Sequence, residues 1–306
     1  MHEGSRRAIV AAFLANLGIA LSKLVAFAIT GAASLLAESI HSLADTGNQG
    51  LLFLGGARAR KAPTEEHPFG FGRERYFWAF VVALVLFSVG SLFAIYEGIQ
   101  KVIDPHELDS PEWAFGVLGV AVVLESLSLH TAVREASKVR GSGSWWSFIR
   151  ASKNPELPVV LLEDVAALTG LVFALAGVAV ATATGDPIYD AIGSIAIGLL
   201  LGVVAVVLAV EMKSLLIGES ASPEMQRAIH DAIMNGPEVD RLIHLRTEHL
   251  GPEDLLVAAK VDLSPAADIA AAKAIDRVEA RIRGRVPSAR VIYLEPDEFR
   301  GENDPY

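Results

Sequence analysis

Six long apolar segments constrain this sequence more than any other feature. Each runs for about 20 residues or more, the length that an α-helix needs to cross the hydrocarbon core of a bilayer. They cover residues 8–30, 33–56, 76–99, 113–133, 157–182 and 188–212. In lipid each segment has to be a helix, because a helix satisfies its own backbone hydrogen bonds. The sequence therefore predicts an α-helical membrane protein with six transmembrane helices.

The charges between these segments predict how the chain is oriented. The loop after the second segment carries Arg58, Arg60, Lys61, Arg73 and Arg75. The loop after the fourth segment carries Arg134, Lys138, Arg140, Arg150 and Lys153. Short basic loops face the cytoplasm, and an even number of spans leaves both termini on that side. The N-terminal stretch does not resemble a cleavable signal peptide. We therefore expect a multi-pass protein of the cell membrane (plasma or inner membrane) with both termini in the cytoplasm.

The composition changes after residue 212, where charged residues become frequent. We expect a helix over 223–235, strands over 242–250 and 255–263, a helix over 266–283 and a last strand over 289–294. The order α-β-β-α-β is typical of helices packed on one sheet, as in ferredoxin-like domains. The predicted domains are a transmembrane transport domain over 1–212 and a small cytoplasmic α+β domain over 213–306.

Composition also excludes several functions. The formal net charge of −10 leaves no basic surface for phosphates, so a nucleic-acid partner is not expected. The chain has no cysteine, so any metal must be held by nitrogen and oxygen ligands. Neither an HExxH nor a GxSxG motif is present. An enzyme is therefore not expected.

The second apolar segment contains the stretch AESIHSLADTG, in which Glu38, His41 and Asp45 are the ionisable residues. Their i, i+3, i+7 spacing places all three on one face of a helix. Ionisable groups at this depth are costly, and they usually face a bundle interior or a water-filled path. An imidazole and a carboxylate one turn apart suit a divalent metal such as zinc. The alternative is that these side chains only form hydrogen bonds with other helices.

Three other apolar segments carry ionisable residues. Glu163 and Asp164 are adjacent in the fifth segment, and neighbours on a helix diverge by about 100°, so both rarely point at one centre. One of them can bind a metal while the other pairs or relays protons. Lys23 is expected to pair with a carboxylate or to extend to the interface. Glu125 can be a proton carrier or a structural partner.

Three motifs resemble those of a known family. HSLAD lies in the second segment, HPFGFGRER precedes the third, and LLEDVAALTG is followed by GDPIYDAIGSIAIGLLLG. With six spans and a cytoplasmic α-β-β-α-β domain, the chain resembles the cation diffusion facilitator family over roughly residues 9–296. The fifth-segment motif is similar to that of the family branch that contains the mitochondrial zinc transporter nine.

The resemblance implies a homodimer that exchanges cytoplasmic divalent cations for protons. It also implies a tetrahedral site with two ligands from the second span and two from the fifth. His41 and Asp45 match the first pair, and Asp164 matches one ligand of the second pair. The position four residues before Asp164 is Val160, which departs from the family pattern. The fourth ligand is then Glu163 or a water molecule.

The expected function is a proton-coupled antiporter that exports zinc from the cytoplasm by alternating access. Zinc is its cargo, and no tightly bound cofactor is expected. Manganese and iron(II) are alternative cargoes, because carboxylates also suit harder ions. Two alternatives of other kinds are a membrane-anchored metal sensor or scaffold, and an organic-cation exporter that uses Glu38 and Glu125.

Overall fold

The computed structural model describes residues 3–105, 111–265 and 270–299, with side chains for all of these except 3–16 and 85–87. The chain divides into two compact units. One contains Met1–Ala57 and Phe77–Met212, and the other contains Arg58–Tyr76 and Lys213–Tyr306. The loop that follows the second helix therefore belongs with the C-terminal part of the chain. A functional boundary at residue 212 stays a prediction.

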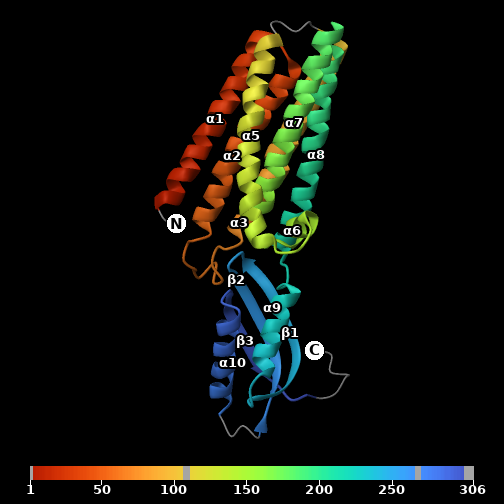
Figure 1. Ribbon diagram of the computed structural model, residues 1–306. Helices are drawn as coiled ribbons and strands as arrows, with labels where there is room; N and C mark the ends of the chain where they lie inside the picture. The colour runs from red at the N-terminus through yellow and green to blue at the C-terminus, as the bar shows by residue number, and fades with distance from the viewer. Residues whose placement is uncertain (1–2, 106–110, 266–269, 300–306) are drawn as a thin grey trace. The chain divides into compact units, whose positions relative to one another are not determined.

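The first unit is built from long helices that run side by side (Figure 1). Its elements are α1 (Glu3–Thr30), α2 (Ala33–Arg58), α3 (Glu74–Val81), the π-helical η1 (Val82–Phe87), α4 (Ser88–Ile103), α5 (Pro111–Arg140), α6 (Trp145–Ala151), α7 (Glu156–Thr184) and α8 (Ile188–Ile217). All six apolar segments of the sequence are thus helical, as predicted.

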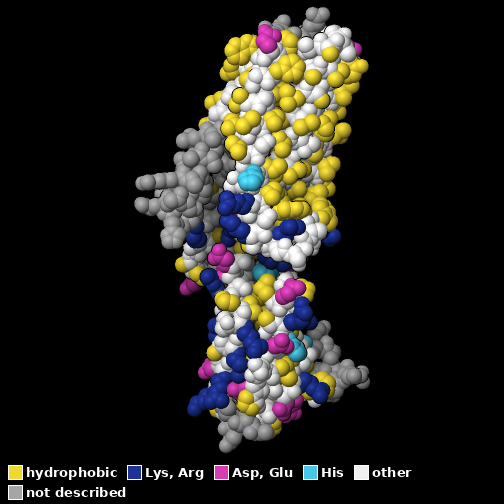
Figure 2. Space-filling view, in the orientation of Figure 1, with side chains coloured by type: hydrophobic (Ala, Val, Ile, Leu, Met, Phe, Trp, Pro, Cys, Tyr) yellow, Lys and Arg dark blue, Asp and Glu magenta, His cyan; other side chains and the backbone are white. Residues whose placement is uncertain are grey.

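Among the described residues, four helices are long and apolar enough to cross a membrane: Glu74–Ile103 (α3, η1 and α4 in one run), α5, α7 and α8. Figure 2 shows hydrophobic side chains over most of the visible face of this unit. The described side chains of α1 supply a shorter apolar stretch, Leu17–Thr30. α2 has 26 residues, but its buried polar side chains lower its hydropathy. The helical membrane fold is confirmed, and spans one and two stay predictions.

Two details of the sequence-based prediction were wrong. α5 continues to Arg140, so Arg134 and Lys138 lie on its last turns and not in a loop. The short helix α6 was not predicted at all. Its N-cap is Ser144, whose hydroxyl accepts a hydrogen bond from the Ser147 N–H at 3.0 Å. Seven residues are too few for an apolar period to stand out.

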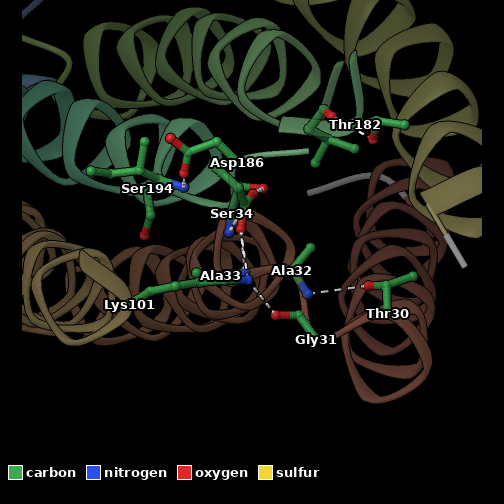
Figure 3. Close-up of polar contacts among 12 residues, drawn as sticks. Thr30, Gly31, Ala32, Ala33, Ser34, Lys101, Thr182, Asp186 and Ser194 are labelled. Atoms are coloured by element: carbon green, nitrogen blue, oxygen red, sulfur yellow. Dashed lines mark hydrogen bonds and ion pairs between the residues drawn. The ribbon is translucent and has the colours of Figure 1, made fainter. Parts of the chain in front are cut away.

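The turn between α1 and α2 is held by charged residues from two later helices. Figure 3 labels the turn residues from Thr30 to Ser34 and Lys101 of α4. The Asp190 carboxylate of α8 accepts hydrogen bonds from the N–H groups of Ala33 at 2.8 Å and Ser34 at 3.3 Å, and from the Ser34 hydroxyl. Lys101 Nζ of α4 lies 3.1 Å from Asp190 Oδ2 and donates to the Gly31 carbonyl at 2.8 Å. We call these five residues the Asp190 cap.

The Asp190 cap satisfies backbone groups that a helix leaves without partners at its first turn. A carboxylate at this position also meets the positive end of the α2 dipole. Gly31 has a φ of 66°, a left-handed conformation that other residues adopt at a cost. Asp190 and Lys101 are both buried. The cap therefore ties α1 and α2 to α4 and α8 through a buried ion pair.

The second unit contains a three-stranded sheet with two helices. Its elements are α9 (Pro223–Met234), β1 (Val239–Gly251), β2 (Asp254–Leu263), α10 (Ala271–Arg285) and β3 (Ala289–Pro296). β2 is central, antiparallel to β1 and parallel to β3. The core is formed by apolar residues of both helices and the sheet, among them Ile233, Val257 and Ile282. The predicted order α-β-β-α-β is confirmed, although residues 266–269 of the predicted second helix lie outside the described residues.

The loop before α3 contacts the β1–β2 hairpin within the same unit. Arg73 forms an ion pair with Glu248 of β1, and Arg75 Nη1 lies 3.9 Å from Glu253 Oε1. The backbone is close here as well, because a Cβ on Gly72 would lie 2.6 Å from the Leu250 carbonyl oxygen. These contacts explain why the loop is grouped with the C-terminal part.

Candidate metal centre

α2 places its three ionisable residues inside the helical unit. Glu38, His41 and Asp45 are 0%, 2% and 5% exposed. All three are buried together because their spacing places them on one face of the helix. The opposite face carries apolar side chains such as Leu43, which is 52% exposed. His41 Nδ1 lies 3.5 Å from Asp45 Oδ1. The predicted pair of ligands therefore faces the bundle interior.

Glu38 has a partner from another helix. Lys23 Nζ of α1 lies 3.0 Å from Glu38 Oε2 and 2.7 Å from the Ser42 hydroxyl. Lys23 and Glu38 are both fully buried. The other oxygen of Glu38 reaches α7 at Gly170, where a Cβ would collide with it. Of the two roles predicted for Lys23, pairing with a carboxylate is confirmed.

α7 buries the other two predicted ligands. Glu163 is 3% exposed and Asp164 is 7% exposed. Asp164 Oδ2 accepts a hydrogen bond from the Ser128 hydroxyl of α5 at 3.1 Å. Sequence reasoning missed Ser128, because a serine in an apolar segment gives no signal by itself.

The predicted ligands lie close enough to influence one another. The Asp45 carboxylate interacts electrostatically with that of Asp164, and the Glu163 carboxylate interacts with those of both aspartates. Asp45 Oδ1 and Glu163 Oε2 are buried without a hydrogen-bond partner among the described residues. Within that part of the chain, no three His, Cys, Asp or Glu side chains are gathered closely enough to hold a metal ion. The structure therefore brings the four residues into one neighbourhood without forming a closed site.

This neighbourhood has the chemistry of a divalent-metal site. A buried carboxylate is costly unless it is paired, and unpartnered oxygens are uncommon in protein interiors. An imidazole and carboxylates are ligands that zinc accepts, and carboxylates alone also suit manganese. His41, Asp45, Glu163 and Asp164 are the residues of α2 and α7 that can supply them.

A cavity of about 470 Å³ opens between α1 and α5. Its lining is mostly apolar and includes Lys23 and Glu112 as the charged residues. None of the four predicted ligands lines it, so it is separate from the candidate metal centre. Sequence reasoning did not predict it, because it depends on how two helices pack.

Comparison with known proteins adds a family match. The model of the cation efflux transmembrane domain matches residues 9–217. This range contains every residue of the candidate metal centre.

Curated relatives match over longer stretches. The mitochondrial proton-coupled zinc antiporter SLC30A9 of Homo sapiens is 34% identical over 242 residues, which is 78% of this chain and 43% of that protein. Metal tolerance protein C4 of Arabidopsis thaliana is 31% identical over 86% of this chain and 58% of its own. The magnetosome protein MamB of Paramagnetospirillum magneticum is 25% identical over 92% of this chain and 90% of its own. The chain thus spans about half the length of the first two.

Proposed function

The chain belongs to the cation efflux family, whose members are transporters, and from this premise we propose that it is a proton-coupled antiporter of divalent metal ions. Zinc is the leading cargo, moved out of the cytoplasm by alternating access. The observation that carries the proposal is the set of buried acids and one histidine on α2 and α7. Two relatives are named as a zinc antiporter and a metal tolerance protein, which supports the same class of cargo.

The proposed zinc ligands are His41, Asp45 and Asp164, with Glu163 as the sequence-based candidate for the fourth position. Zinc is the transported substrate here and not a resident cofactor. Metal binding requires a neutral imidazole and ionised carboxylates, so protons and metal compete for the same atoms. Protons that enter from the opposite side of the membrane then release the metal, and the exchange follows by linkage.

The protein has several candidate membrane spans, and we place it in the cell membrane with both termini in the cytoplasm. The support is the excess of lysine and arginine in the loops after the second and fourth apolar segments. A homodimer is part of the same proposal, and it rests on the family resemblance.

The test is metal flux in proteoliposomes with an acidic interior and an enclosed zinc-sensitive dye. We expect the pH gradient to accelerate zinc entry for the wild type and for Asp186→Ala, whose side chain is exposed. We expect no acceleration for Asp45→Ala, which removes a ligand. Gradient-driven flux that persists in both Asp45→Ala and Asp164→Ala would contradict the proposed site.

Two other outcomes would change the proposal in different ways. Flux of manganese or iron(II) without zinc flux keeps the antiporter and changes its cargo. If folded protein transports none of these ions, we would assign it instead as a membrane-anchored metal sensor or scaffold.

Ser128→Ala is expected to weaken zinc binding about 10- to 100-fold, because the hydroxyl that orients Asp164 is lost. The matched control is Ser126→Ala on the same helix, whose hydroxyl donates to the Val122 carbonyl of α5 itself. Equilibrium dialysis of zinc against purified protein gives both affinities. Equal affinities of the two variants would show that Ser128 does not position a ligand.

A further inference from the structure

One buried carboxylate has no role in the proposed mechanism. Glu125 lies in the middle of α5 and is 8% exposed. Leu118, Ala121 and Glu125 are all buried, and their i, i+3, i+7 spacing defines a single inward face of α5. An acid on such a face is costly unless it has a partner or a function.

The same face of α5 meets α7 at a proposed ligand. Ser128 lies three residues after Glu125, so it is its neighbour on the helix surface. Its hydroxyl donates to Asp164 Oδ2 at 3.1 Å. Glu125 therefore lies one helical turn from Ser128, the residue of α5 that contacts Asp164 directly.

Charge links Glu125 to both halves of the candidate metal centre. Its carboxylate interacts electrostatically with Asp45 of α2, and with Glu163 and Asp164 of α7. Carboxylates that share a buried space are stabilised by protonation or by a cation. The Lys23 ammonium is one such cation, because it also interacts with Glu125, and a bound metal ion would be a second. Asp45 Oδ1, more than nine-tenths buried, makes no hydrogen bond among the described residues, and its contact with His41 Nδ1 is 3.5 Å long, which also indicates a missing cation.

α7 by itself offers a poor pair of ligands. Glu163 and Asp164 diverge by about 100° around the helix axis, so only one of them faces a given point. One turn before Asp164 the side chain is that of Val160, which has no donor atom. Besides water, a third helix is a source of a ligand for the face that Asp164 occupies.

We propose that Glu125 is a metal ligand, so that the transported ion binds among α2, α5 and α7 through His41, Asp45, Glu125 and Asp164. This inference rests on the proposed function and deepens it. Glutamate has three side-chain torsions, and rotation about them brings its carboxylate toward Asp45 and Asp164 when a cation is present. Glu163 then lies outside the first coordination shell.

The test is zinc binding to the purified full-length protein by equilibrium dialysis, with manganese and iron(II) as further probes. We expect Glu125→Gln to weaken zinc binding by about 10- to 100-fold or more. Glu163→Gln tests the competing assignment of the fourth position, and we expect it to weaken zinc binding less than Glu125→Gln does. The matched control is Glu135→Gln on the same helix, because Glu135 is half-exposed and pairs with Lys138. Zinc-edge X-ray absorption should show one oxygen ligand replaced in Glu125→Gln and an unchanged shell in Glu135→Gln.

A rescue variant separates ligation from structure. Val160 lies one turn before Asp164 on α7, so histidine there supplies a nitrogen ligand at the position that Glu125 is inferred to fill. We expect Glu125→Gln/Val160→His to regain most of the lost affinity. Glu125→Asp, which keeps the charge but shortens the side chain, should fall between wild type and Glu125→Gln.

The outcomes distinguish this inference from the function on which it rests. Wild-type protein that binds zinc, with Glu125→Gln equal to Glu135→Gln, would overturn the role of Glu125 alone. A loss in Glu163→Gln without a loss in Glu125→Gln would assign the fourth position to Glu163. Wild-type protein that binds none of the three metals would overturn the proposed function, and this inference with it.

Discussion

Lys23→Met is expected to lower the free energy of unfolding by about 3–5 kcal/mol, because it leaves a buried carboxylate without its cation. Lys23 and Glu38 are fully buried and 3.0 Å apart, so the substitution removes the cation nearest to the Glu38 carboxylate. The Ser42 hydroxyl loses a donor as well. Titration of detergent-solubilised protein with SDS, followed by circular dichroism, measures the change.

The same substitution at an exposed lysine is the control for Lys23→Met. Lys138 pairs with Glu135, and its side chain is 60% exposed, so Lys138→Met should change the free energy by no more than about 0.5 kcal/mol. Glu38→Gln added to Lys23→Met should restore part of the loss, because the stranded charge is gone. A Lys23→Met protein as stable as Lys138→Met would show that the pair does not support the fold.

Asp190→Asn is also expected to cost about 3–5 kcal/mol, for a related reason. The Lys101 ammonium, 6% exposed, would lose its carboxylate partner, and two N–H groups of α2 would lose a charged acceptor. The same SDS titration measures the effect, and Lys101→Met/Asp190→Asn closes a double-mutant cycle.

Asp186 provides a matched control on the connection between α7 and α8. Its side chain is exposed and accepts a hydrogen bond from the Ile188 N–H at 3.0 Å. Asp186→Asn should therefore be close to neutral. Equal stabilities of Asp186→Asn and Asp190→Asn would mean that the Asp190 cap contributes little to stability.

The lengths of the apolar segments predicted the helices well, because lipid leaves the chain few alternatives. They did not predict where the helices end, since α5 continues through charged residues to Arg140. The polar side chains that mark α2 as a site also make it less apolar than the four long helices.

The candidate site could likewise be predicted only in part from the sequence. His41, Asp45, Glu163 and Asp164 could be found from the sequence, because an ionisable residue in an apolar helix stands out. Which residues meet across helices could not. Ser128 and Asp164 are 36 residues apart, and only helix packing brings them together. Asp190 gave no signal of its own, since its partners Ala33 and Ser34 are more than 150 residues earlier in the chain.

That separation has a consequence for the order in which the protein is made. Asp190 is synthesised 156 residues after Ser34, which takes roughly 8–30 s at ~5–20 residues per second. Until the ribosome has passed α8, the N–H groups in the first turn of α2 lack the Asp190 carboxylate as acceptor. The Lys101 ammonium also lacks its counter-charge, so it is not held in place to donate to the Gly31 carbonyl. We expect the first two helices to enter the bilayer early as a loosely closed hairpin, and to lock into place only when the last helix is inserted.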